Sequence, residues 1–258
     1  RRARIVGRTR IRAVVGLLFL AACTAPRTDR PGGDAPDGEP TSPASSPPTS
    51  SPPTSSPPEP AAAAEIRPVS RRQWNRMKRV GVWRAGCPLA RTDLRRVEVN
   101  HYTFDGTVER GALVVNRDVA PAIAEIFTEL FDKKFPIRKM RPVEAYGGDV
   151  NASLRDDNTS AYNCRRPDQI NAPPQFSPHA NGRAIDINPR ENPWMDLRCQ
   201  CWVPTPETRA RVPGPGVIVK GGLVWRLFRE RGWIWQNIKV PDYMHFDTGY
   251  PSRPYTPS

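Results

Sequence analysis

Two short segments of the chain contain two of its three histidines, and each segment also carries a carboxylate. The first runs from Ser177 to Asp186 and includes His179, and the second runs from Asp242 to His245. Two imidazoles and one carboxylate make a three-ligand zinc site that leaves a fourth position for water, as in catalytic zinc centres. We therefore expect His179, Asp186 and His245 to bind one Zn²⁺ ion.

A further carboxylate lies where a general base is needed. Asp242 precedes His245 by three residues, a spacing that lets one side chain hold the metal while the other faces the water. The alternative for Asp242 is an exposed charge after Pro241. Asp247 is the second candidate, since it would share the face of His245 on a strand.

These residues resemble the D-alanyl-D-alanine metallopeptidase family, which includes D-alanyl-D-alanine carboxypeptidases and L-alanyl-D-glutamate endopeptidases. The second signature of the family is an acidic residue, two others and a histidine, which Asp242 and His245 match. Its first signature is Ser-x-His-x-x-Gly-x-Ala-x-Asp, matched here by Ser177, His179, Gly182, Ala184 and Asp186.

The resemblance extends from about Trp83 to Asp247, and it implies zinc, a peptidoglycan stem-peptide substrate and the fold of lysostaphin-like and hedgehog amino-terminal domains. In the family an upstream arginine binds the scissile carbonyl. The resemblance implies this role for Arg165, with Arg166 as the second candidate. The base is Asp here, where the dipeptidase branch uses Glu; the endopeptidase-like branch tolerates Asp. The rival function is a wall-binding lipoprotein that keeps the fold and zinc without catalysis.

Helices and strands must position these residues, and their order predicts an α+β domain with a small antiparallel sheet and flanking helices. We expect a helix capped by Ser70 and a longer one capped by Asp118. A further helix should span residues 222–231. Residues 147–175 read as a long irregular stretch. Strands are expected at residues 97–102, 112–116, 183–188, 233–235 and 244–246.

Cysteine usage predicts an oxidising compartment. With Cys23 set aside, Cys87, Cys164, Cys199 and Cys201 remain. They allow three pairings, of which we favour one that joins Cys87 to Cys164. A four-thiolate zinc site is the weaker alternative, because Cys199 and Cys201 are too closely spaced for the usual knuckle.

The first part of the chain reads as targeting signal and tether. Residues 1–23 combine an arginine-rich start, a short apolar run and Leu-Ala-Ala-Cys, which resembles the lipobox of bacterial lipoproteins. An ordinary signal peptide is the alternative. Residues 24–65 are rich in Pro, Ser and Thr and predict a disordered linker, which leaves residues 66–258 for the peptidase domain. We expect an exported protein, lipid-anchored through Cys23 to the outer face of the cell membrane, next to the cell wall.

The net charge of +13 partly reflects this signal, which contains six arginines in its first twelve residues. The remaining basic charge suits an anionic partner such as the carboxylates of peptidoglycan or other wall polymers. We expect no nucleic-acid partner, because the chain contains no basic repeat, and we expect a monomer. Ser177 is open to two roles, orienting a metal ligand or forming a turn, while His101 reads as structural.

Overall fold

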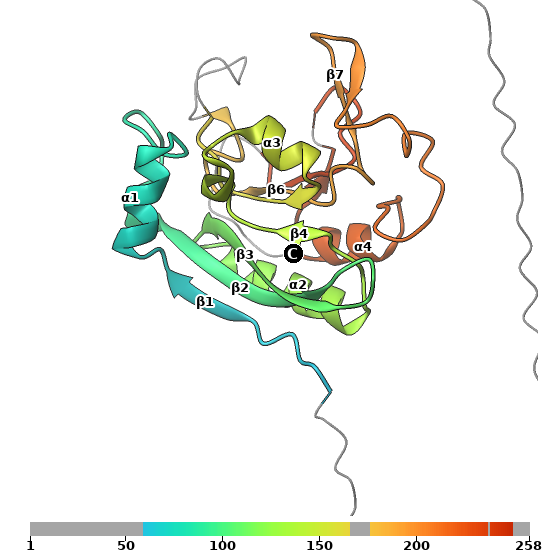
Figure 1. Cartoon of the computed structure of the whole chain (residues 1–258), viewed down its shortest axis with the longest axis horizontal. Helices are drawn as coiled ribbons and strands as arrows, with labels where there is room; N and C mark the ends of the chain where they lie inside the picture. Colours follow the sequence, from blue (N-terminus) through green and yellow to red (C-terminus); the bar gives the residue numbers. More distant parts are fainter. Residues whose placement is uncertain (1–58, 166–175, 237, 250–258) are drawn as a thin grey trace, which may run out of the picture. The chain divides into compact units, whose positions relative to one another are not determined.

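The computed structural model describes residues 59–165, 176–236 and 238–249, and it confirms the predicted α+β class. Two three-stranded sheets and two strand pairs are combined with four α-helices and two short 3₁₀ helices within these residues (Figure 1). In chain order the elements are β1 (Glu65–Pro68), α1 (Arg71–Arg79), η1 (Arg91–Asp93), β2 (Leu94–Tyr102), β3 (Val108–Asn116), α2 (Ala120–Asp132), β4 (Lys139–Met140), η2 (Val143–Tyr146), α3 (Val150–Arg155), β5 (Asn158–Thr159), β6 (Ala184–Asp186), β7 (Trp194–Asp196), β8 (Cys201–Val203), α4 (Leu223–Glu230), β9 (Ile234–Trp235) and β10 (His245–Asp247).

The first sheet has the order β1-β2-β3 and is antiparallel throughout. β2 and β3 pair along their whole length, and α2 packs against β2 (Figure 1). α2 has an apolar stripe that is buried, with the side chains of Ile123, Ile126, Phe127, Leu130 and Phe131 in the core.

The second sheet carries the site and has the order β6-β10-β9, also antiparallel. α4 supports it, since Phe228 stacks on Phe246 of β10 with ring centroids 4.2 Å apart. Side chains from this sheet, including Ile185 and Phe246, belong to the same buried cluster as α2. The two sheets therefore share one hydrophobic core.

The N-terminus of α1 is capped by a neighbouring side chain as predicted, whereas the N-terminus of α2 is not. Ser70 caps α1 as predicted, because its hydroxyl accepts the N–H of Gln73 at 3.1 Å. The prediction that Asp118 caps α2 is wrong, since Val119 is the N-cap residue. The Asp118 carboxylate pairs instead with Arg183 of the site segment. Asp118 thus contacts a residue far along the chain and not the first turn of α2.

The predicted irregular stretch from residue 147 is wrong in part. It contains α3, whose N-cap Asp149 accepts the N–H of Ala152 at 3.0 Å, and the short strand β5. Residues 166–175 of this stretch lie outside the described part of the chain. The hairpin β7–β8 was not predicted, because strands of three residues show no clear alternation.

Two disulfides join the four cysteines of the described domain. The predicted Cys87–Cys164 bond is confirmed, and it links the segment after α1 to the segment after β5. The second bond joins Cys199 in the β7–β8 turn to Cys201, the first residue of β8. The alternative of a four-thiolate zinc site is thereby excluded for these cysteines.

The folded packing begins before the predicted domain boundary at residue 66. Ala62 is buried, and its carbonyl accepts the N–H of Asn100 at 2.8 Å. The predicted signal segment and most of the predicted linker lie outside the described residues. In the part of the chain that is described, no helix has the length and apolar character needed to cross a bilayer.

Candidate metal centre

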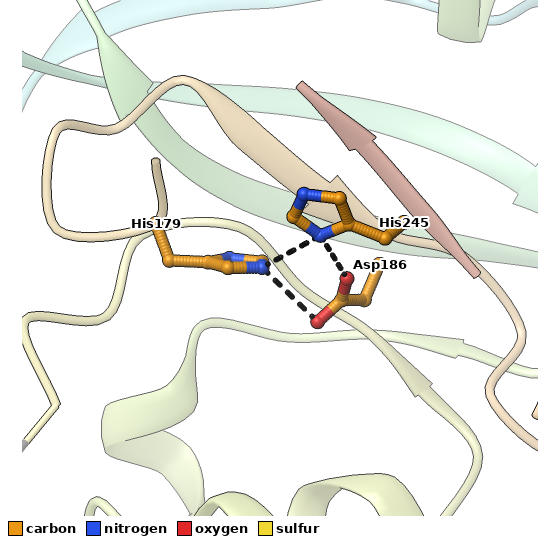
Figure 2. A group of neighbouring side chains, drawn as sticks. All are labelled: His179, Asp186 and His245. Carbon is orange, nitrogen blue, oxygen red and sulfur yellow. Dashed lines mark hydrogen bonds and ion pairs between the residues drawn. The ribbon is translucent and has the colours of Figure 1, made fainter. Parts of the chain in front are cut away.

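Strand pairing brings two of the predicted ligands together. Asp186 on β6 and His245 on β10 are direct partners in the antiparallel register. Directly opposed residues on adjacent antiparallel strands place their side chains on the same face. His245 Nδ1 lies 3.1 Å from Asp186 Oδ1 as a result, and both residues are buried (Figure 2).

The third ligand comes from the turn that leads into β6. His179 is buried, and its Nδ1 lies 2.8 Å from the carbonyl oxygen of Ala161. Gly182 closes this turn with a φ of +64°, and a Cβ there would lie 2.5 Å from the backbone nitrogen of Asn116. Glycine is required on both counts. The motif glycine therefore lets the turn pack against the end of β3 and carry His179 to the sheet.

The three side chains form a compact donor set (Figure 2). His179 Nε2 lies 3.3 Å from Asp186 Oδ2 and 3.2 Å from His245 Nδ1. Two ligand atoms of a tetrahedral zinc ion with bonds of about 2.0 Å are separated by about 3.3 Å. The spacing of the donor atoms thus fits a metal ion of this size.

The hydrogen bonds of the two imidazoles aim their free nitrogens at the same point. The Ala161 carbonyl is only an acceptor, so His179 Nδ1 carries the hydrogen and Nε2 presents a lone pair. His245 Nε2 lies 3.0 Å from the Asp247 carboxylate, which leaves Nδ1 to face Asp186 and His179. Three acceptors converge in this arrangement, and a cation between them relieves their repulsion.

The electrostatics of the group also favour a bound positive charge. Burial alone would lower the pKa of His245, but hydrogen bonds to Asp186 and Asp247 raise it to about 10. Burial lowers the pKa of His179, and for Asp186 the two histidines outweigh burial and hold its pKa well below the usual range. A proton on His245 or a metal ion can supply the charge that the carboxylates demand.

Two further carboxylates lie beside the donor set, and their contacts differ. Asp247 bonds His245 Nε2, and its other oxygen accepts the N–H of Gly249 at 2.7 Å. Asp242 Oδ1 is buried and has no hydrogen-bond partner within the described residues. Burial raises the pKa of Asp242 to about 7, against the opposing effect of His245. Asp247 is thus placed to orient a ligand, and Asp242 has an oxygen left for another partner.

Arg165 lines the same cavity of about 630 Å³ as the donor set and Asp242. Its Nε is buried without a hydrogen-bond partner in the described part of the chain. Arg84 fixes the backbone here, since its guanidinium bonds the carbonyls of Cys164 and Arg165. Arg166, the reserve candidate, lies outside the described residues.

The structure also places the remaining candidates. The Ser177 hydroxyl accepts the N–H of Ala180 at 3.4 Å, which is a turn contact. His101 is buried on β2 with no hydrogen-bond partner among the described residues, and it does not line the cavity.

Arg198 of the β7–β8 turn also lines the cavity, although it was not predicted. Its Nη2 donates to Asp196 Oδ2 at 2.6 Å. No sequence signal marked Arg198, because only the unpredicted hairpin brings it to the cavity.

Comparison with protein families agrees with this geometry. Residues 171–248 match the family model described as D-alanyl-D-alanine carboxypeptidase. The predicted family resemblance is confirmed. The matched segment contains the donor set and Asp242, whereas Arg165 lies upstream of it. No curated protein and no solved structure gives a significant match to the chain. The family match indicates a carboxypeptidase-like, metal-dependent peptidase, and the donor set is where this chain could bind the metal.

Proposed function

We propose that this protein is an exported zinc peptidase that hydrolyses peptidoglycan stem peptides, as a D-alanyl-D-alanine carboxypeptidase or an L-alanyl-D-glutamate endopeptidase. One observation carries the proposal: His179, Asp186 and His245 converge at metal-ligand spacing in a cavity that also contains Asp242 and Arg165. Two histidines and one carboxylate are a donor set typical of catalytic zinc, and they leave a position for substrate or water.

Zinc in this position would lower the pKa of a bound water toward ~7 and polarise the scissile carbonyl. Asp242 would take the proton from the attacking water and pass it to the leaving amine, since its Oδ1 has no hydrogen-bond partner within the described residues. Its raised pKa, about 7, suits a group that must both accept and release a proton near neutrality.

Arg165 would hold the carbonyl oxygen as negative charge develops on it. Arg165 lines the cavity from a backbone that Arg84 and the Cys87–Cys164 disulfide hold in place. A fixed positive group aimed at developing charge lowers the barrier without reorganisation, which is the basis of oxyanion stabilisation. The size of the cavity is in the range of sites that enclose a small ligand.

Export and membrane attachment form the second half of the proposal. They are supported by the arginine-rich start, the apolar run and Leu-Ala-Ala-Cys that ends at Cys23. The two disulfides also suit an oxidising compartment. The proline-rich linker would let an anchored domain reach stem peptides in the wall.

Digestion of purified peptidoglycan by the full chain, followed by mass spectrometry of the products, tests the activity. Release of the terminal D-alanine marks a carboxypeptidase, and cleavage between L-alanine and D-glutamate marks an endopeptidase. Product should disappear with a chelator and return with zinc. A chain that binds zinc and peptidoglycan yet releases no product would support the non-catalytic wall-binding alternative.

A further inference from the structure

A second cavity, of about 570 Å³, lies apart from the metal centre and shares no lining residue with it. β1, α1, β2 and the connection from β4 to η2 enclose it. All the cationic residues in its described lining are arginines, namely Arg67, Arg72, Arg76, Arg96 and Arg141. We call this cavity the arginine groove.

The fold brings like charges together here. Arg67 on β1 and Arg96 on β2 are directly opposed in the antiparallel register. Arg72 and Arg76 are four residues apart on α1, so their side chains lie on the same face of the helix. Like charges in either position are destabilising, and an anion between them would offset that cost.

The carboxylates of the molecule balance only part of this charge. Arg96 pairs with Glu98 at 2.6 Å, and Arg67 pairs with Glu65. Within the described residues no carboxylate forms an ion pair with Arg72, Arg76 or Arg141, each of which is exposed.

One acidic residue, Glu144, is among the described lining residues, and its carboxylate offsets part of the charge of Arg96 and Arg76. Glu144 is buried and accepts a hydrogen bond from Gln73 Nε2 at 2.8 Å. Burial also raises its pKa. Within the described residues the groove therefore presents three guanidinium groups that form no ion pair, those of Arg72, Arg76 and Arg141.

We propose that the arginine groove binds the phosphate groups of an extended anionic polymer. Guanidinium groups bind phosphate oxygens through paired N–H donors, a geometry that lysine lacks. The apolar residues of the described lining are Pro68, Pro142 and Ala145, and none of the described lining residues is an aromatic or a long aliphatic residue that could enter a bilayer. A concave basic groove of this kind suits a narrow chain of phosphates better than a membrane surface. The proposal is independent of the proposed peptidase activity.

Fluorescence anisotropy with labelled linear inorganic polyphosphate tests the site in the full chain. The groove variant combines Arg72→Gln, Arg76→Gln and Arg141→Gln. The matched control combines Arg117→Gln, Arg155→Gln and Arg209→Gln, which remove the same charge from exposed positions outside both cavities. Thermal unfolding and muropeptide cleavage of both variants should equal those of the wild type.

The groove variant should bind polyphosphate at least about tenfold more weakly than the wild type. The slope of the logarithm of its binding constant against the logarithm of the salt concentration should be smaller in magnitude by about two. The control should stay close to the wild type. Equal weakening in both variants would show that the charge acts diffusely and would overturn the proposal. Equally tight binding of poly-glutamate would overturn the preference for phosphate. A groove variant that loses binding only to phosphatidylglycerol vesicles, and not to polyphosphate, would assign the groove to a membrane instead.

Discussion

Asp242 and Asp247 both lie beside His245, but their contacts indicate different roles. Asp247 already accepts from the imidazole and from the Gly249 amide, so it fixes the ring that faces the metal position. Groups of this kind fix the orientation and basicity of a ligand, and their loss typically costs about 10- to 100-fold in metal affinity or activity. Asp242 lies in the same cavity with a buried oxygen that no described group engages. This difference favours Asp242 as the base.

Replacing each of the two aspartates by asparagine, one at a time, tests this assignment. Asp242→Asn should keep the zinc and lose activity by a factor on the order of 100 to 10,000, the effect of removing a general acid–base group. Asp247→Asn should bind zinc about 10- to 100-fold more weakly and regain activity when zinc is added. Elemental analysis and turnover under zinc titration measure both. An active Asp242→Asn enzyme beside a dead, zinc-loaded Asp247→Asn enzyme would reverse the roles.

Arg165 is the other residue whose role can be isolated. If its guanidinium holds the oxyanion, Arg165→Ala should lower kcat more than it raises KM, because the interaction strengthens as charge develops. Arg165→Lys should recover only part of the loss, since the planar pair of donors is absent. Steady-state kinetics of Arg165→Ala and Arg166→Ala, side by side, separate the two candidates. Unchanged turnover in Arg165→Ala would remove it from the site.

At the scale of elements, one disulfide supports the cavity and the other closes a short turn. Cys87–Cys164 spans 77 residues and holds the backbone next to Arg165, together with Arg84. Cys199 and Cys201 are only two residues apart, and their bond joins the β7–β8 turn to the start of β8. A cross-link that closes a long loop restricts the unfolded chain more than one that closes a short loop.

Replacing each pair by serine should therefore have unequal effects. Removing Cys87–Cys164 should lower the free energy of unfolding by about 4 kcal/mol, against about 2 kcal/mol or less for Cys199–Cys201. The first variant should also lose kcat while its folded fraction keeps zinc, because Arg165 is less firmly placed. Urea unfolding, zinc content and turnover of the two variants provide the comparison. Equal losses of stability and activity in both would contradict the supporting role of Cys87–Cys164.

Elements and site residues differed in how far the sequence alone could locate them. His179 and Asp186 were predictable because one contiguous motif contains both, with Gly182 marking the tight turn between them. The apolar stripe of α2 was predictable for the same reason, since its period is local. Arg198 and the true partner of Asp118 depend on contacts that only the folded chain creates.

At the scale of the whole molecule, the proposed ligands come from segments that lie far apart in the sequence. Asp186 and His245 belong to the second sheet, and His179 belongs to the turn whose glycine packs against the end of the first. A metal ion bound by all three would tie the turn to the paired strands β6 and β10. The free energy of metal binding at such a position also stabilises the folded state, because the unfolded chain does not assemble the site.

Zinc should accordingly raise the stability of the whole domain. With free zinc at about 1,000 times its dissociation constant, the gain is about 4 kcal/mol, and Tm should rise with zinc concentration. His179→Ala and Asp186→Ala should abolish both the zinc content and this dependence. His101→Gln, at the remaining histidine on β2 and outside the cavity, should lower Tm but keep the zinc-dependent rise. Calorimetry and elemental analysis of the four proteins measure these effects. Full zinc occupancy in both ligand variants, or loss of the rise in His101→Gln, would show that the metal binds elsewhere.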